Sequence, residues 1–289
     1  MSTDLPEKYP KHITVEGSVF ELVDVQRGGS AIYKNENYYL RIGDLPKLGE
    51  DLTLHKRMES FGFPVAQLVS EGNFQNMPYF IEESLGTECF GQIFKKETQT
   101  FGQVTDESFG KFLAITAQFA TAQLKTVSET KNWETFRTGL HLDILCQELP
   151  LLKQKIIDKY SQVEERLKAF PFGILHGDFT PFNIYPKGII DLEDSFLGPV
   201  GFDVGAFPGI QNWFPDTSDD ELHKVYKCTN SQTQEYLRTM DNIYQGEGLP
   251  KISDFLDEFN FTKGIWFTVR MQHLPSLQQF RYELMESLI

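Results

Sequence analysis

The sequence predicts an α+β protein whose two parts differ in secondary structure. Residues 1–83 read as short apolar runs separated by turn residues, together with one helical segment, which is typical of a strand-rich lobe. Residues 84–289 carry mainly amphipathic helical patterns. A connector at residues 82–86 lies between them. We therefore expect a smaller domain at residues 1–83 and a larger one at residues 84–289, joined by a hinge.

Five strands and one helix account for the first part. The helix is expected at residues 49–61, where apolar side chains recur on one face before Gly62 and Pro64 end it. The strands are expected at residues 14–23 (around Gly17), 31–33, 38–42, 65–70 and 78–82. In the second part, helices are expected at residues 108–126, at 142–167 with a break at Pro150, and from 219 onward with breaks at Pro250 and Pro275.

Composition narrows the class of protein. A chain of 289 residues that is 40% hydrophobic and 24% charged can bury a sizeable core. Its net charge of −14, from 41 acidic against 27 basic residues, argues against binding to nucleic-acid phosphates or to anionic lipid. The same charge would suit a cationic substrate, although acidity that serves solubility alone explains it equally well.

Cysteine spacing and the terminal sequence indicate the compartment. Cys89, Cys146 and Cys228 are odd in number and far apart, so neither a disulfide framework nor a zinc site is expected. The first residues lack the pattern of a secretory signal, and no apolar run approaches the ~20 residues that span a bilayer. We expect a cytoplasmic location. No coiled-coil pattern predicts an oligomer, so the oligomeric state stays open.

The most informative motif lies near the middle of the chain, where His176-x-Asp178-x-x-x-x-Asn183 is followed by Asp191. Two short apolar runs around the turn residues 186–188 predict a hairpin, with Asn183 where one strand begins and Asp191 near the end of the other. Asp178 is then a carboxylate placed to accept a proton. Asn183 and Asp191 offer the hard oxygen ligands that Mg²⁺ prefers. Phosphoryl transfer needs this set of groups.

The order of these motifs resembles the family of aminoglycoside phosphotransferases and choline-kinase-like enzymes, which are small-molecule kinases with a two-lobe protein-kinase-like fold. The resemblance covers residues 15–210 and is strongest from Leu175 to Asp203. It runs through His176-Gly177-Asp178, Pro181-x-Asn183-Ile184, Ile190-Asp191, Gly198-Pro199 and Phe202-Asp203-Val204-Gly205. A protein kinase is disfavoured because Asp191-Leu192-Glu193 stands where Asp-Phe-Gly is required and little room is left for an activation loop.

The resemblance also implies residue roles. Asp178 would be the catalytic base, Asn183 and Asp191 the magnesium ligands, and ATP or GTP the phosphoryl donor. Asp203 and His176 would brace the catalytic loop. Gly28, Gly29 and Ser30 would cover the nucleotide phosphates, although an ordinary hairpin turn explains that glycine pair equally well. The backbone of Glu82 and Ser84 would contact the base at the hinge.

One residue departs from the family. Arg41 stands where the family has a lysine paired with a helix glutamate, and Glu50 is the expected partner here, with Asp51 as second choice. Arginine keeps the charge but forks differently from lysine. In one interpretation Arg41 does the lysine's work. In the other, the nucleotide site is weakened, and the protein is a pseudokinase-like module that regulates a partner.

The sequence indicates the acceptor substrate less directly than it indicates the reaction. The segment after Asp203 is rich in acids and rings, which would suit an aminoglycoside, an amino alcohol such as choline, or a sugar. Equally, the acids can form a solvated face and the rings a core. The acids are Asp216, Asp219, Asp220, Glu221, Glu235 and Asp241, and the rings are Trp213, Phe214, Tyr226, Tyr236, Tyr244 and Trp266. The leading hypothesis is a kinase that phosphorylates a hydroxyl of a small molecule.

Overall fold

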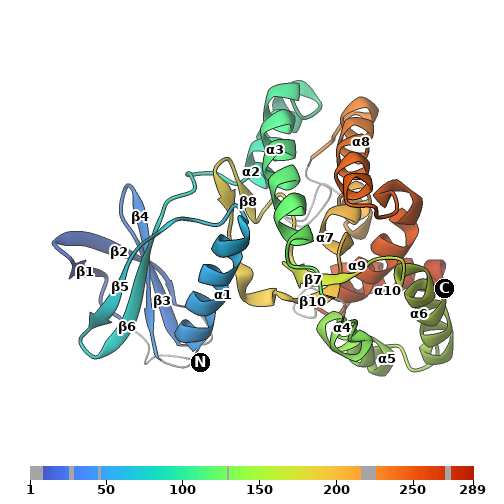
Figure 1. Ribbon diagram of the computed structural model, residues 1–289, viewed down its shortest axis with the longest axis horizontal. Helices are drawn as coiled ribbons and strands as arrows, with labels where there is room; N and C mark the ends of the chain where they lie inside the picture. The colour runs from blue at the N-terminus through green and yellow to red at the C-terminus, as the bar shows by residue number, and fades with distance from the viewer. Residues whose placement is uncertain (1–8, 26–28, 45–46, 129, 216–225, 271–274) are drawn as a thin grey trace. The chain divides into compact units, whose positions relative to one another are not determined.

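The structure is a computed structural model of the chain that describes all residues except 1–8, 26–28, 45–46, 129, 216–225 and 271–274. The chain forms two compact units. The first comprises residues 1–87 and 187–193, and the second comprises residues 88–186 and 194–289. The first unit contains an antiparallel sheet and the second is mainly helical (Figure 1), so the predicted α+β class is confirmed. The expected domain boundary between residues 83 and 84 stays a prediction.

The first unit is built on a six-stranded antiparallel sheet with the order β1-β2-β3-β4-β6-β5. Its strands are β1 (His12–Val15), β2 (Ser18–Val25), β3 (Ser30–Lys34), β4 (Tyr38–Gly43), β5 (Leu68–Phe74) and β6 (Met77–Glu83). The single strand expected around Gly17 is two strands, because Glu16 and Gly17 both have positive φ, at 49° and 77°. Two such residues form the tight turn that suits a two-residue hairpin.

One helix packs on this sheet, and one predicted strand is displaced. Helix α1 (Lys47–Phe61) contacts β4 and β6, as the sequence pattern indicates. The strand expected at residues 65–70 forms instead at Leu68–Phe74, because Gln75 and Asn76, at φ 51° and 66°, make the turn into β6. Val65 pairs with Ile189 in an isolated parallel bridge and so does not join the sheet.

The second unit holds most of the helices. They are α2 (Phe90–Phe101), α3 (Asp106–Leu124), α4 (Trp133–Leu140), α5 (Leu142–Glu148), α6 (Lys153–Leu167), α7 (Phe202–Gly205), α8 (Asn230–Gly246), α9 (Leu256–Thr268) and α10 (Pro275–Leu288), with 3-10 turns η2 (Phe207–Trp213) and η3 (Ile252–Phe255). None of the described helices is long and apolar enough to cross a membrane. Helix α9 is the central one: it contacts α4, α5, α6, α7 and α10, and its residues from Phe261 to Thr268 are all buried.

A short antiparallel pair lies among these helices. Strands β7 (Phe172–Leu175) and β10 (Phe196–Pro199) pair so that Gly198 faces Gly173. Helix α4 packs on this pair closely: a Cβ at Gly198 would lie 2.4 Å from the ring of Phe136. Glycine is therefore required there because no side chain would fit.

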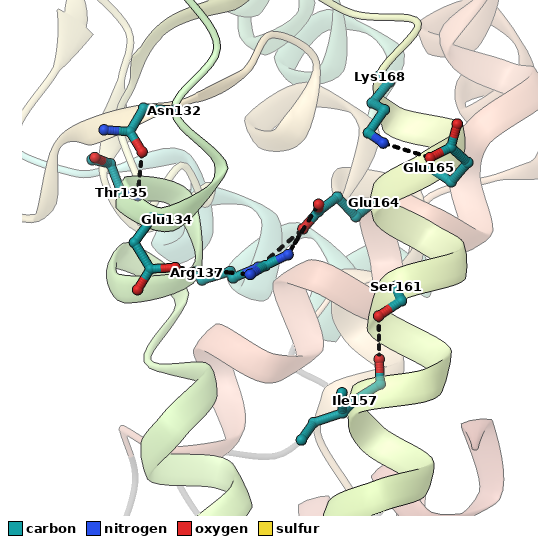
Figure 2. A network of polar contacts seen from close by, with 9 residues as sticks. All are labelled: Asn132, Glu134, Thr135, Arg137, Ile157, Ser161, Glu164, Glu165 and Lys168. Atoms are coloured by element: carbon teal, nitrogen blue, oxygen red, sulfur yellow. Dashed lines mark hydrogen bonds and ion pairs between the residues drawn. The ribbon is translucent and has the colours of Figure 1, made fainter.

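An ion pair joins helix α4 to helix α6. Arg137 of α4 donates to both carboxylate oxygens of Glu164 of α6, at 2.8–3.0 Å (Figure 2). The guanidinium carbon also lies 5.6 Å from the ring centroid of Tyr160 on α6. Helix α4 begins at a cap in which the side chain of Asn132 accepts from the backbone N–H of Thr135. A forked two-point contact of this kind fixes orientation as well as distance.

Close packing of α9 against η2 yields a test of the second unit. A Cβ at Gly264 would lie 1.9 Å from the Trp213 ring, so Gly264→Ala should lower the free energy of unfolding by about 1–3 kcal/mol. The matched control is Gly110→Ala on the exposed face of α3, where a Cβ meets nothing within 4 Å. That change should raise the free energy of unfolding by about 0.5–1 kcal/mol. Denaturant titration measures both, and equal stabilities would contradict the packing described.

Candidate active site

The loop that carries Asp178 follows strand β7, whose four residues are all buried. His176 is fully buried, and Gly177 adopts φ +83°, a conformation that favours glycine. A Cβ at Gly177 would lie 2.4 Å from the carbonyl oxygen of Asp194, so a side chain is excluded for a second reason. The chain thus turns sharply at Gly177 and leaves Asp178 half-buried at the exit.

Asp203 of α7 holds this turn from beneath. Its fully buried carboxylate accepts the backbone N–H of His176 at 2.9 Å and that of Gly177 at 3.1 Å. The side-chain amide of Gln123 on α3 donates to the same carboxylate at 3.1 Å. Burial raises the pKa of the Asp203 carboxyl, while Lys263, His176 and the two N–H donors oppose that rise. These contacts are those expected of a residue that braces the loop.

Lys263 of α9 reaches the loop from the other side. Its ammonium donates to the carbonyl oxygen of Gly177, although the side chain is only 1% exposed. Three rings surround the ammonium, with centroids 4.5–5.2 Å away, namely those of Phe202, Trp266 and Phe267. Burial lowers the pKa of Lys263, and the charges of Asp178 and Asp203 oppose the decrease. A cation therefore lies within electrostatic reach of Asp178.

Asp178 and Asn183 contact each other directly. The side-chain nitrogen of Asn183 donates to Asp178 Oδ2 at 2.9 Å and to the Asp178 carbonyl oxygen at 2.9 Å. Because both bonds use the amide nitrogen, the carbonyl oxygen of Asn183 is the atom left to serve as a ligand. Phe179 pins the intervening loop by stacking on Phe119, with ring centroids 4.0 Å apart. The two predicted residues are therefore brought together.

The other expected magnesium ligand, Asp191, belongs to the first unit. The return strand predicted at residues 189–192 is shorter: β9 spans Gly188–Ile189, and a 3-10 turn, η1 (Leu192–Asp194), begins soon after. Asp191 lies between them with φ +64°, which breaks the strand. Left-handed backbone at a residue other than glycine is uncommon and is found preferentially at functional sites. On the other side of the turn, β8 (Ile184–Tyr185) begins directly after Asn183, as predicted.

Asp191 lines a pocket in the first unit, which it shares with Arg41 and Glu82. The remaining lining residues are Asp51, Leu54, His55, Ala66, Phe80, Ile189, Ile190, Leu192 and Glu193. Arg41 Nε lies 3.2 Å from Glu82 Oε1, and the charges of Glu82, Asp51 and Asp191 raise the pKa of Arg41 even though burial acts in the opposite direction. The pocket thus places the guanidinium of Arg41 among carboxylates, one of which is that of Asp191.

The expected partner of Arg41 requires a correction. Glu50 is exposed on α1, and Arg41 contacts Glu82 instead. The reason is the register of the sheet. Strands β4 and β6 are neighbours, and Glu82 of β6 lies opposite Tyr39 of β4. Tyr39 is two residues before Arg41 on the same strand, so Glu82 is a diagonal neighbour of Arg41. Asp51, the second choice, does line the same pocket and acts on Arg41 through its charge.

The remaining nucleotide-contact residues are placed as follows. Gly28 lies outside the described residues, Gly29 has φ +82°, and Ser30 is buried as the first residue of β3. The backbone N–H of Ser84 donates to the carbonyl oxygen of Asn37 at 2.8 Å, so its carbonyl is the group left to meet a base. Glu82 lies in β6, between β4 and β5, and it lines the pocket, where its side chain accepts from Arg41.

Most rings proposed for the acceptor belong to the core. Trp213, Tyr226, Tyr236, Tyr244 and Trp266 are all buried. Phe214 is half-buried and packs against Phe267. Of the acids, Asp216, Asp219, Asp220 and Glu221 lie outside the described residues, and Asp241 accepts hydrogen bonds from Ser253. These rings therefore do not form an aromatic cage for an acceptor.

Sequence reasoning missed two side chains, one in each unit. Lys263 interrupts an apolar run between Phe261 and Phe267, and a lone cation in such a run is a usable signal of a buried role. His55 follows Asp51 by four residues, so both lie on one face of α1 and both line the pocket. Neither residue belongs to the motif that drew attention to residues 176–191.

A family model described as the phosphotransferase enzyme family (APH) matches residues 31–239. A search of curated proteins finds no match.

Solved structures share the fold at low identity. A choline/ethanolamine kinase family protein of Mesorhizobium loti has TM-score 0.56 and 12% identity, with 92% of this chain and 87% of that chain covered. An ethanolamine kinase of Plasmodium vivax has TM-score 0.53 and 13% identity, covering 93% and 81%. An aminoglycoside phosphotransferase of Streptomyces rimosus, solved with ADP and streptomycin, has TM-score 0.50 and 12% identity, covering 86% and 92%.

These likenesses confirm the predicted protein-kinase-like fold. The matching family model covers well over half of the 289 residues. The chain therefore belongs to the phosphotransferase enzyme family.

Proposed function

We propose that the protein transfers the γ-phosphoryl group of ATP or GTP to a hydroxyl of a small molecule. The observation that carries this proposal is the Asp178–Asn183 pair on a loop braced by Asp203 and Lys263. A carboxylate held in this way presents one oriented acceptor for a proton. Positioning of this kind, together with charge stabilisation, is most of what phosphoryl transfer requires from a protein.

Asp178 acts as the base in this proposal. It orients the acceptor hydroxyl and takes its proton as the hydroxyl oxygen bonds to the transferred phosphorus. Asn183, through its carbonyl oxygen, and Asp191 are the proposed magnesium ligands, and their hard oxygens fit that ion. Bound magnesium would neutralise charge on the nucleotide phosphates. Arg41 would contact the same phosphates, where its fork can meet two oxygens at once.

For the acceptor, a cationic compound such as an aminoglycoside or an amino alcohol is the first class to screen. The net charge of −14 supports this choice. The similar solved structures include ethanolamine kinases and an enzyme bound to streptomycin, which supports it further. A second candidate function is a regulatory nucleotide-binding module of low activity. The arginine at position 41 favours that candidate, because its guanidinium forks differently from the ammonium of the family's lysine.

Asp178→Asn tests the catalytic role. The amide oxygen of the new side chain can still accept from Asn183, so the loop keeps its shape while the base is lost. We expect kcat to fall by about 10²–10⁴-fold, the usual contribution of general base catalysis, with little change in stability. Asp143→Asn, at an exposed position of α5, is the matched control and should leave turnover unchanged. Equal turnover of Asp178→Asn and wild type would sink the assignment.

Thermal unfolding with Mg·ATP and Mg·GTP tests the nucleotide site. At about 100 times its dissociation constant, a ligand adds about 2.7 kcal/mol, which raises the midpoint by roughly 5–10 °C for a chain of this size. Excess chelator should remove most of the shift. Asn183→Ala and Asp191→Asn should shrink the part that depends on magnesium.

The size of the shift also separates the candidates. A larger shift with one nucleotide identifies the preferred donor. A shift without turnover on any acceptor would favour the regulatory module, and a large gain of turnover in Arg41→Lys would point the same way. No shift with either nucleotide at millimolar concentration would contradict the kinase proposal.

A further inference from the structure

The pocket of the first unit contains a chain of three polar side chains, two of them buried and that of Arg41 half-buried. Arg41 of β4, Glu82 of β6 and His55 of α1 are 21%, 9% and 7% exposed at their side chains. Arg41 Nε is 3.2 Å from Glu82 Oε1, and His55 Nδ1 is 3.6 Å from Glu82 Oε2. The two oxygens of one carboxylate thus face two different side chains. Groups buried in this way are costly unless they are paired, so their arrangement is under strong constraint.

The far end of this chain is anchored to the backbone. His55 Nε2 lies 2.6 Å from the carbonyl oxygen of Ala66, and because a carbonyl can only accept, Nε2 carries the proton of this hydrogen bond. Next to Ala66, Val65 bridges Ile189, and Pro64 accepts the N–H of Ile189 at 2.7 Å. The segment that fixes His55 is therefore the same one that holds the chain leading to Asp191.

Arg41 has three carboxylates within electrostatic reach, and only Glu82 contributes both a charge and a hydrogen bond to the raised pKa of Arg41. The other two are Asp51 and Asp191. Without Glu82, the guanidinium would be left in a buried pocket with Asp191 as one of its remaining counter-charges. Pairing with Asp191 would set a fixed cation against a proposed magnesium ligand. Glu82 therefore decides where the charge of Arg41 is held.

We propose that Glu82 is a positioning residue that holds Arg41 for contact with nucleotide phosphates and keeps it away from Asp191. In this chain the role is filled from the neighbouring strand, and His55 of α1 lies beside the other oxygen of the same carboxylate. The proposal rests on the proposed nucleotide-dependent function, and it adds a specific determinant of nucleotide and magnesium affinity.

Glu82→Gln is the main test, since it keeps the shape of the side chain and removes the charge. We expect the KM for nucleotide and the magnesium concentration at half-maximal activity each to rise by about tenfold, the cost of about 1.4 kcal/mol of lost interaction. The KM for the acceptor should stay within about twofold of wild type, because the side chain of Glu82 faces Arg41 and His55 in the pocket of the first unit. Glu82→Asp retains the charge on a shorter side chain. Its nucleotide KM and its half-maximal magnesium concentration should lie between those of wild type and those of Glu82→Gln.

Glu50→Gln is the matched control, because Glu50 is an exposed carboxylate on α1 that faces solvent. It should leave both constants unchanged. The proposal is overturned if Glu82→Gln leaves the nucleotide and magnesium constants at wild-type values. It is also overturned if the acceptor KM rises as much as the nucleotide KM, because that pattern would indicate general damage to the fold.

A double-mutant cycle tests the pair without any ligand. Unfolding of wild type, Arg41→Gln, Glu82→Gln and the double variant, measured without nucleotide or magnesium, should give a coupling of at least about fivefold in the unfolding equilibrium. Additive effects would overturn the proposal even if the variants are inactive. Coupling in a protein that binds no nucleotide would instead preserve the Arg41–Glu82 pair and reject the proposed function, so the two failures are distinguishable.

Discussion

The catalytic loop depends on one buried carboxylate, Asp203. A carboxylate without solvent is stable in the fold only if donors surround it, and here the donors are two backbone N–H groups of the loop and the amide of Gln123. The requirement acts in both directions: Asp203 needs the loop's N–H groups, and the loop needs Asp203 to fix its turn. Gln123 extends the constraint by also donating to the carbonyl of Ile174 in β7. The position of Asp178 is thereby tied to α3 and α7.

Lys263 completes the arrangement with the opposite polarity. The N–H groups of the loop point to an anion, and the carbonyl of Gly177 points to a cation. The N–H groups of His176 and Gly177 and the carbonyl of Gly177 thus each have a partner of suitable charge, and the carboxylate of Asp178 lies half-buried after them. The aromatic rings around Lys263 shield the ammonium from water and strengthen its field at the loop. In this unit, the contacts that pack the core are therefore the same ones that fix the position of Asp178.

Sequence patterns predicted the features that local chemistry decides. The spacing of Asp178 and Asn183 was sufficient to predict their contact, because five residues cannot separate widely in a tight loop. Helix α1 and the strands β4 and β6 followed from periodicity. The strand at residues 65–70 was displaced because Gln75 and Asn76 adopt positive φ without any glycine to signal it. Lys263 and His55 were missed because each acts through residues far away in the chain.

Arg41 shows why a partner is harder to predict than a motif. Glu50 is nine residues from Arg41 and Glu82 is 41 residues away, so proximity in sequence favours the wrong carboxylate. The true partner is chosen by the register of β4 against β6, and that register follows from the burial pattern of the whole sheet rather than from either residue. Identities of 12–13% to solved structures of the same fold are consistent with this difference between motif residues and the residues that hold them. Few positions are bound to the chemistry, and the side chains that hold them can be supplied from whichever element the fold brings near.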